Sequence, residues 1–334
     1  MVKHPKKGYK GMVNIGVTRN KFLKNEESLS SVQYNLLKKF IYNRIDTSNQ
    51  KIVDFCENNL LEFNFKIHKL LPTDTFNLLV IPIINSCNLN CKSCDAYAPL
   101  CSNNVRLYSK KDIIKDVKTL IDLGIHLKEI SLEGGEPLLH PEVIDIICGL
   151  KEILSSTTHL TLLTNGILLN KLSDEDLLKI KESLCTIVID KYFESKDLDL
   201  AIERLKTLGV NWELDGCVDS SGWFHRAYIT LDESKIKDTT SMQNFISCEK
   251  ANNIFTLDNS ILYICGRSAS IKHFNKYFNL DLPDDGINIR NIHTREDLIK
   301  RLAKPCKLCK HCLPVTDFGY SWEESDKDIK EWVK

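Results

Sequence analysis

Between about residue 76 and residue 217, short apolar runs alternate with helical patterns, and this alternation limits the possible fold more than any other feature. The runs that read as strands are 78–84, 128–132, 159–164, 186–190 and 210–214. Helical patterns lie near 109–123, 141–155, 173–183 and 197–208. Ser109 and Ser173 stand at expected N-caps, and Gly209 at an expected C-cap. Strict alternation predicts an α/β fold with parallel strands and right-handed crossovers.

Parallel barrels keep their chemistry at the carboxyl ends of the strands, so the residues that follow each run are the first candidates for a site. Five strand–helix units can be counted in this region, and we expect a sixth strand at 227–231.

Three cysteines follow the first strand directly, and their spacing is the most informative chemical feature of the chain. Cys87, Cys91 and Cys94 form a C-x3-C-x2-C pattern. Thiolates are the soft ligands that hold iron–sulfur clusters. Three of them leave one iron of a four-iron cluster without a protein ligand, where a reactive molecule can bind. Two alternatives remain from spacing alone: part of a zinc site, or chance in a cysteine-rich chain.

A second motif follows the second strand, where residues 132–137 read Leu-Glu-Gly-Gly-Glu-Pro. The two motifs, in this order, resemble the radical S-adenosylmethionine (SAM) superfamily. The resemblance implies a partial (β/α)6 TIM-like barrel and a 4Fe–4S cluster on Cys87, Cys91 and Cys94. The open iron would bind SAM, which is cleaved reductively to a 5′-deoxyadenosyl radical that takes hydrogen from a substrate. An external electron donor such as flavodoxin or ferredoxin is implied as well.

The resemblance also assigns SAM contacts in the second motif. Gly134 and Gly135 would let the backbone approach the methionine amino group closely, because glycine has no side chain. Glu136 would accept a hydrogen bond from the same ammonium group. An ordinary strand-to-loop turn is the alternative for the two glycines.

Three further residues are expected near the nucleoside part of SAM. Ser93 stands where the superfamily usually has an aromatic residue, and its backbone carbonyl would still reach the adenine. Thr164 and Asn165 end the third strand and are candidates for ribose contacts. A capped turn is the alternative for this pair.

The region from about 232 to 334 changes character and carries a second group of cysteines. Residues 257–265 read as a small hairpin that turns at Asn259 and Ser260 and ends at a cysteine. The group resembles the auxiliary-cluster domains called twitch or SPASM, which implies a second, auxiliary 4Fe–4S cluster. A tetrahedral zinc site is the alternative. The candidate ligands are Cys248, Cys265, Cys309 and Cys312, with Cys306 as a spare or substitute.

Two other features have weaker functional interpretations. Cys217, just past a strand, is a candidate hydrogen-atom donor to a substrate radical, with a buried structural thiol as the alternative. Arg226 and Arg267 can bind a carboxylate or phosphate, or can be solvated surface. The charge-rich stretch after Ser321 is expected to form a solvated helix.

Composition limits partners and location. The 334 residues carry 45 basic and 45 acidic side chains, so no global field attracts nucleic acid or an anionic membrane. No signal peptide is apparent, and no stretch approaches the roughly twenty apolar residues of a membrane span. Thirteen cysteines without a secretion signal indicate a reducing cytoplasm.

These patterns predict three regions: a helical N-terminal extension over 1–75, a radical SAM barrel over 76–231 and an auxiliary iron–sulfur domain over 232–334. The predicted function is a radical SAM oxidoreductase or maturase acting on a small molecule or peptide. Oxidation, cross-linking and epimerisation are the expected outcomes. The first 75 residues show no leader-binding domain, which favours a small molecule or short peptide. The alternatives are a non-catalytic iron–sulfur or zinc protein that binds a partner, and an activating enzyme for a glycyl-radical protein.

Overall fold

The structure is a computed structural model, and it describes residues 50, 74–192, 195–215, 224–226, 228–237, 239–248, 250–251, 253–313 and 317–334. The predicted helical extension over 1–75 lies almost wholly outside these residues, and so does Cys217. Both therefore stay predictions.

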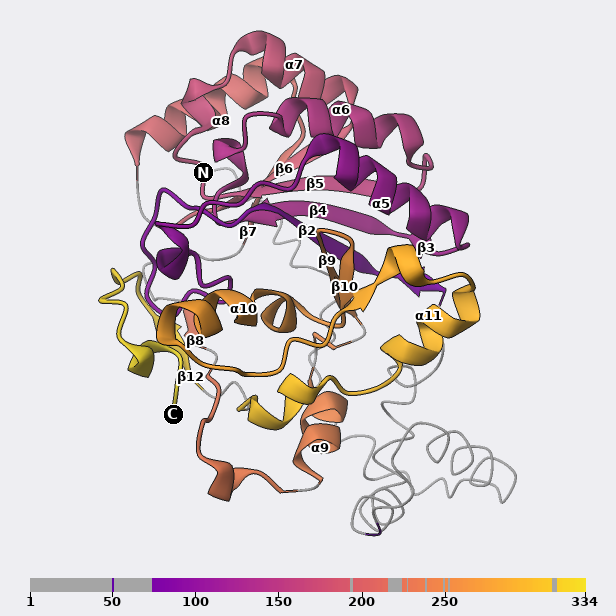
Figure 1. Ribbon diagram of the computed structural model, residues 1–334. Coiled ribbons are helices and arrows are strands. Elements are labelled where there is room, and N and C mark those ends of the chain that lie inside the picture. Colours follow the sequence, from indigo (N-terminus) through magenta and orange to yellow (C-terminus); the bar gives the residue numbers. More distant parts are fainter. Residues whose placement is uncertain are drawn as a thin grey trace, which may run out of the picture.

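One mixed sheet of eight strands organises the described chain, in the order β11-β10-β9-β2-β4-β5-β6-β7 (Figure 1). Five consecutive strands run parallel, as the alternation predicts. They are β2 (Leu78–Ile84), β4 (Glu129–Gly134), β5 (His159–Thr164), β6 (Cys185–Asp190) and β7 (Trp212–Asp215). A short parallel pair, β1 (Thr75–Phe76) with β3 (His126–Leu127), lies apart from the large sheet. The mostly parallel sheet fits a partial barrel.

The sixth parallel strand is β9 (Ile254–Asp258), which lies beside β2 on the edge away from β4. The expected sixth strand at 227–231 is therefore wrong. The nearest strand, β8 (Phe224–Arg226), pairs with β12 (Asp317–Tyr320) outside the large sheet, and Ile229 forms only isolated bridges. Apolar alternation predicts an extended chain but does not specify its partner, which here is another distant segment.

Four helices cover one face of the sheet (Figure 1). Ser109 and Ser173 cap α5 and α7 as expected, and Gly209 ends α8 with a positive φ of 67°. The strand side chains below the helices are apolar and buried, for example Leu79, Ile81 and Ile83. The helices are α5 (Lys110–Asp122), α6 (Val143–Ile153), α7 (Asp174–Glu182) and α8 (Lys196–Leu208). The carboxyl ends of the parallel strands, where the polar residues stand, are thus available for a site.

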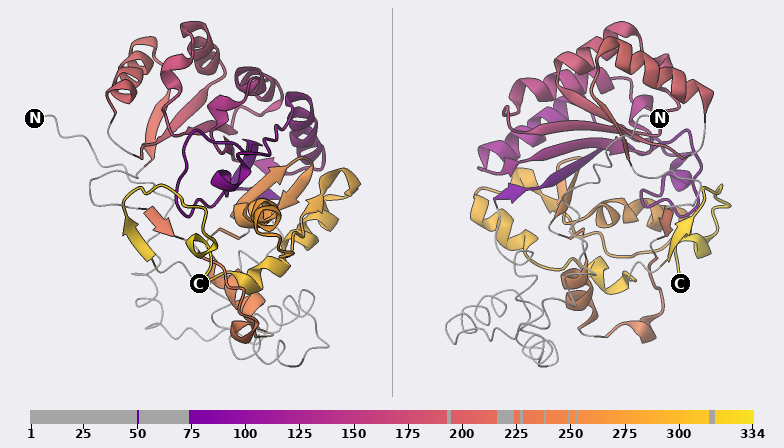
Figure 2. Two further views of the ribbon diagram at one scale, coloured as in Figure 1. Left: turned by 60° about the vertical axis from the view of Figure 1, so that its left-hand side comes forward. Right: turned by 180° about the vertical axis from the view of Figure 1, so that it is seen from behind.

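The C-terminal part extends this sheet. The strands β9 and β10 (Ile261–Tyr263) form the predicted hairpin, and Asn259 and Ser260 both have positive φ, as a type I′ turn requires. A short strand, β11 (Ile287–Asn288), adds to the edge. This part also contains α9 (Thr240–Ser247), α10 (Gly266–Phe278) and α11 (Arg295–Leu302), which lie on the side of the sheet away from α5–α8 (Figures 1 and 2).

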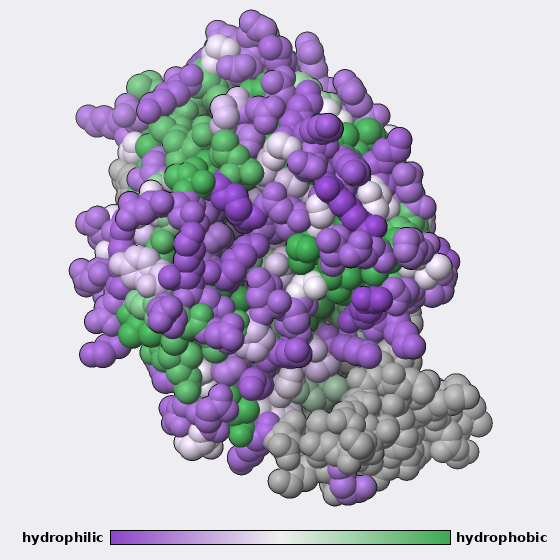
Figure 3. Space-filling model, viewed as in Figure 1, coloured by the Kyte–Doolittle hydropathy of each residue, from purple (hydrophilic) through white to green (hydrophobic). Residues whose placement is uncertain are grey.

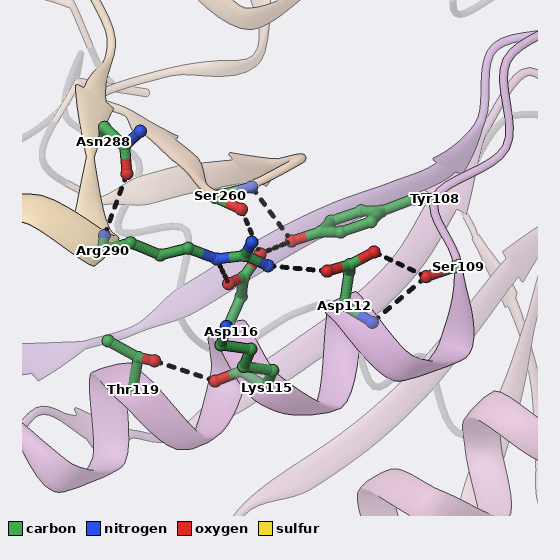
Figure 4. Close-up of polar contacts among 9 residues, drawn as sticks. All are labelled: Tyr108, Ser109, Asp112, Lys115, Asp116, Thr119, Ser260, Asn288 and Arg290. Carbon is green, nitrogen blue, oxygen red and sulfur yellow. Dashed lines mark hydrogen bonds and ion pairs between the residues drawn. The ribbon is translucent and has the colours of Figure 1, made fainter.

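A buried polar cluster joins the hairpin to α5 (Figure 4). Asp116 on α5 is fully buried and accepts hydrogen bonds from the hydroxyls of Tyr108 and Ser260, the latter at 2.8 Å. Arg290 completes the cluster, with Nε 2.8 Å from an Asp116 carboxylate oxygen. Removing one partner of such a buried cluster is strongly destabilising, so these contacts fix the hairpin against the barrel.

The face of the molecule in Figure 3 is mostly hydrophilic, with hydrophobic residues in scattered patches. Among the described residues, no helix is long and apolar enough to cross a membrane.

Candidate active site

The three cysteines of the first motif lie on the loop that leaves the carboxyl end of β2. All three are free thiols and partly buried. Burial raises the pKa of the Cys87 thiol to about 11 and that of Cys91 to about 12, and it also raises the pKa of Cys94. Without a metal, these thiols therefore stay protonated at neutral pH. Metal binding would release their protons, as is general for cysteine sites. Because all three donors are sulfur atoms, the set fits an iron–sulfur cluster.

The turn at Gly134 and Gly135 packs against the base of this loop. A Cβ atom at Gly134 would collide with the backbone oxygen of Ile84, and one at Gly135 with that of Ser86. Gly135 N–H donates to Ile84 O at 2.8 Å, and Glu136 N–H donates to Ser86 O at 2.9 Å. Glycine is therefore required here by the close approach of two backbones, a reason that the sequence did not reveal.

Glu136 joins the ends of two strands. Its side chain is fully buried, and burial raises the pKa of its carboxyl. Its Oε1 accepts hydrogen bonds from Thr164 Oγ1 at 2.7 Å and from Leu138 N at 3.0 Å, while Oε2 accepts from Asn165 N at 2.9 Å. The carboxylate thus holds the end of β5 against the Gly-Gly turn, a positioning role beside the predicted ammonium contact.

Asn165 connects this arrangement to the cysteine loop. Its Nδ2 donates to Asn88 Oδ1 at 2.8 Å and lies 3.9 Å from Cys87 Sγ. The structure therefore brings together residues from three predicted positions: the cysteine loop, the Gly-Gly turn and the end of β5. The ribose and methionine contacts assigned to these residues stay predictions.

Ser93 is held by Glu331, in the stretch after Ser321 that was expected to form a solvated helix. It is 7% exposed and has a left-handed backbone with φ of 58°. Its hydroxyl donates to Glu331 O at 2.7 Å, and its N–H lies 3.4 Å from Glu331 Oε2. The adenine contact expected of its carbonyl stays a prediction.

The segment 322–332, which we name the closing segment, lies along the cysteine loop (Figure 2). Its expected form, a solvated helix, is wrong: only Ile329–Glu331 form a short 3₁₀ turn, η7, and Trp332 is 1% exposed. A solvated helix was expected because charged residues dominate the sequence after Ser321. The tryptophans Trp322 and Trp332 were the available contrary signal, since large aromatic residues are rarely left in water.

The second group of cysteines comes from three separate elements. Cys248 caps the end of α9, and Cys265 precedes α10 directly after the hairpin. Cys306 and Cys312 flank the 3₁₀ turn η6 (Lys307–His311), and Cys309 lies within it. Asn244 on α9 donates from Nδ2 to Cys309 O and to Cys312 O, both at 2.7 Å. The fold thus brings α9 and η6 together.

Cys306, the candidate spare ligand, lies close to another cysteine of this group. Its Sγ lies 3.4 Å from Cys309 Sγ, and both residues are buried. Burial raises the pKa of Cys265, with Cys306 and Cys248 as smaller contributors. Burial also raises the pKa of Cys312 to about 11, opposed by Arg267, whose Nη1 lies 3.5 Å from its sulfur. In the part of the chain that the structure describes, no three His, Cys, Asp or Glu side chains form a group suited to one metal ion.

Charged side chains lie between the two cysteine groups. Asp95, next to Cys94, pairs with Lys250 at 3.1 Å and with Arg267 at 3.7 Å. Because Arg267 also contacts Cys312, one ion pair spans from the loop after β2 to the second group. Arg267 is mostly buried, which disfavours the solvated alternative.

Glu133, in the second motif, is a further site candidate that the motif alone did not indicate. It precedes the Gly-Gly turn on β4, and burial raises the pKa of its carboxyl to about 7. A carboxyl that titrates near neutral pH at a strand end is characteristic of functional sites.

Residues 81–190 match the model of the Radical SAM superfamily. The matched residues are 110 of the chain's 334, so the match concerns this part alone. The radical SAM match begins inside β2 and ends with β6, so it includes the cysteine loop, the Gly-Gly turn and the end of β5. The second cysteine group lies outside the matched residues.

The chain is also similar to curated relatives over part of its length. It is 30% identical to the GTP 3′,8-cyclase of Clostridium perfringens (strain SM101 / Type A) over 149 residues, which are 43% of each protein. It is 39% identical to that of Microcystis aeruginosa over 100 residues, 29% of each. The chain thus spans less than half of the length of these relatives.

Two solved structures show a loose likeness. The structure of BtrN in complex with AdoMet and 2-DOIA has 14% identity and a TM-score of 0.45, covering 74% of this chain and 97% of that one. Streptococcus suis SuiB bound to S-adenosylmethionine has 11% identity and a TM-score of 0.34, covering 85% and 75%.

Proposed function

We propose that this chain is a radical SAM enzyme whose cluster is held by Cys87, Cys91 and Cys94. The observation that carries the proposal is the hydrogen-bonded connection among three strand ends. The cysteine loop, the Gly-Gly turn and the end of β5 meet through Glu136 and Asn165. The match to the superfamily covers these same residues.

A bound cluster would supply the one electron, taken from a donor such as flavodoxin or ferredoxin, for reductive cleavage of S-adenosylmethionine to methionine and a 5′-deoxyadenosyl radical. The protein's own part is to bind and orient. Glu136 fixes the turn, and Asn165 fixes the loop. Thr164 donates a hydrogen bond to Glu136, and we assign Thr164 and the backbone carbonyl of Ser93 to the nucleoside part of SAM.

We further propose that the second cysteine group holds an auxiliary cluster, with Cys248, Cys265 and Cys309 as ligands and Cys306 or Cys312 as the fourth. The convergence of α9, the hairpin and η6 supports this assignment. An auxiliary cluster would accept an electron from a substrate radical, which favours oxidation or cross-linking of a small molecule or short peptide. Epimerisation would need a hydrogen donor instead.

Anaerobic reconstitution tests the proposal. We expect about eight irons per chain, as two four-iron clusters. With dithionite and SAM, the wild type should form 5′-deoxyadenosine slowly even without substrate, whereas Cys91→Ala should form none. Cys148→Ala, a thiol on α6 away from both groups, is the matched control and should behave like the wild type. Cleavage that persists in Cys91→Ala would overturn the assignment.

A further inference from the structure

The closing segment is bound to the cysteine loop along its backbone. Lys92 N–H donates to Glu323 O at 3.0 Å, and Ser325 N–H donates to Asn90 O at 2.8 Å. Cys91 and Glu324 form the antiparallel bridge between these two bonds. A salt bridge between Lys92 and Glu323, at 2.6 Å, adds to the contact. The middle cysteine of the motif is therefore held by a segment more than two hundred residues away.

Two indole N–H groups of the closing segment point at the loop, and they have different acceptors. Trp322 Nε1 lies 3.2 Å from Cys91 Sγ. Trp332 Nε1 donates to the backbone oxygen of Cys94 at 3.0 Å, and its ring packs near Tyr97 and Phe274. Trp332 thus anchors the closing segment to the backbone of the cysteine loop. Trp322 instead contacts the sulfur of Cys91, which is a cluster ligand in the proposed function.

A hydrogen bond to a ligand sulfur affects a cluster in a definite direction. The bond withdraws electron density from the sulfur, and this favours the reduced cluster, which carries the extra negative charge. Hydrogen bonds to the sulfurs and solvent exposure are among the features that set the potential of iron–sulfur clusters. The effect is stronger in a partly buried site, because the local dielectric constant is low.

We propose that Trp322 is a positioning residue of the cluster site, whose indole N–H binds the Cys91 sulfur and raises the midpoint potential of the cluster. The proposal rests on the proposed function, because it takes Cys91 as an iron ligand. Without the indole N–H, the cluster would be harder to reduce by the same electron donor. The closing segment would then be part of the site and not a solvated end.

Trp322→Phe tests this proposal, because it removes the N–H and keeps an aromatic ring. In the reconstituted protein, the cluster whose electron paramagnetic resonance spectrum changes on addition of SAM is titrated against solution potential. We expect the ratio of reduced to oxidised cluster at a fixed potential to fall about tenfold, which is about 59 mV for one electron. Trp212→Phe on β7 is the matched control and should leave the potential unchanged.

The outcomes separate this proposal from the one on which it rests. A wild type with no SAM-responsive cluster would overturn the proposed function and this inference together. A wild-type potential in Trp322→Phe, with the cluster intact, would overturn the inference alone. If Trp322→Phe holds too little iron to titrate, amide hydrogen exchange over 87–95 in the metal-free protein decides. Faster exchange there than in Trp212→Phe supports the contact, and equal exchange overturns it.

Discussion

The two cysteine groups of this chain are built in different ways. Cys87, Cys91 and Cys94 lie within one loop after a strand, so their spacing in the sequence already brings them close together. The second group is assembled from the end of α9, the start of α10 and the turn η6, which only the folded chain brings together. A site within one loop can be recognised by its spacing, whereas the ligand set of an assembled site depends on tertiary packing.

The surroundings of the two groups differ as well. The buried carboxyl of Glu136 lies next to the base of the first loop, where the Glu136 N–H donates to Ser86 O, and the closing segment also contacts this loop. The second group is held by a neutral amide, Asn244, and a cation, Arg267. This contrast indicates different electrostatic environments, and the following predictions test whether it also separates two functions.

The largest expected effect distinguishes cleavage from product formation. Cys309→Ala should still cleave SAM, because the first loop is intact, but oxidised product should disappear while 5′-deoxyadenosine accumulates. Cys91→Ala should lose both. Quantifying both products by chromatography checks this, with folding monitored by circular dichroism. Parallel loss of both in a folded Cys309→Ala protein would leave the second group with a structural role only, and the comparison would fail.

The next prediction concerns the fourth ligand of the assembled group. Cys306 and Cys309 have adjacent sulfurs, whereas Cys312 is already bonded by Arg267. We therefore expect Cys306→Ala to lower the iron content by up to about four per chain, the content of one cluster. Cys312→Ala should lower it less. Iron analysis of the two variants, prepared side by side, checks the order. The reverse order would assign the ligand role to Cys312.

Glu136→Gln should weaken the first site without affecting the second. The amide keeps the shape of the carboxylate, but one of its two positions is a donor, so at least one of three buried hydrogen bonds is lost. We expect a loss of about 1–3 kcal/mol in the free energy of unfolding and lower iron occupancy at the first loop. Chemical denaturation of the metal-free protein measures the first quantity. Glu152→Gln, exposed on α6, is the control and should stay within about 0.5 kcal/mol of the wild type.

The last expected effect is a pH dependence of stability from Glu133. Its pKa in the fold, about 7, lies above the ordinary value of 4.5. Between these values the folded state holds the proton more strongly, so the stability from this group is full below about pH 4.5 and is lost as the pH rises through 7. Relative to the wild type, Glu133→Gln should thus gain stability between pH 5 and pH 8, by up to about 2.5 kcal/mol for the full shift of this pKa.

Thermal unfolding at the two pH values measures this difference. The exposed Glu182→Gln on α7 is the control and should show no such change between pH 5 and pH 8. A constant difference between Glu133→Gln and the wild type at both pH values would contradict the prediction.

The sequence predicted local structure well and distant pairing poorly. The ranges 78–84 and 159–164 agree with β2 and β5 at both ends, because each has a strong apolar pattern bounded by clear breaks. The sixth strand failed because the pattern at 227–231 does not specify a partner, and the hairpin that includes β9 was expected in a separate domain. The prediction for the closing segment failed because its partners in the cysteine loop lie more than two hundred residues away in the sequence. Local patterns carry no information about such contacts.

The distance between the cysteine loop and the closing segment has a consequence for when the site is complete. Cys91 and Trp322 are 231 residues apart in the chain. At about 5–20 residues per second, synthesis of the intervening chain takes roughly 10–50 s. During that time the loop exists without Trp322, Glu331 and Trp332 beside it. Any machinery that delivers iron to the nascent chain would therefore meet a more open loop than the one in the finished protein.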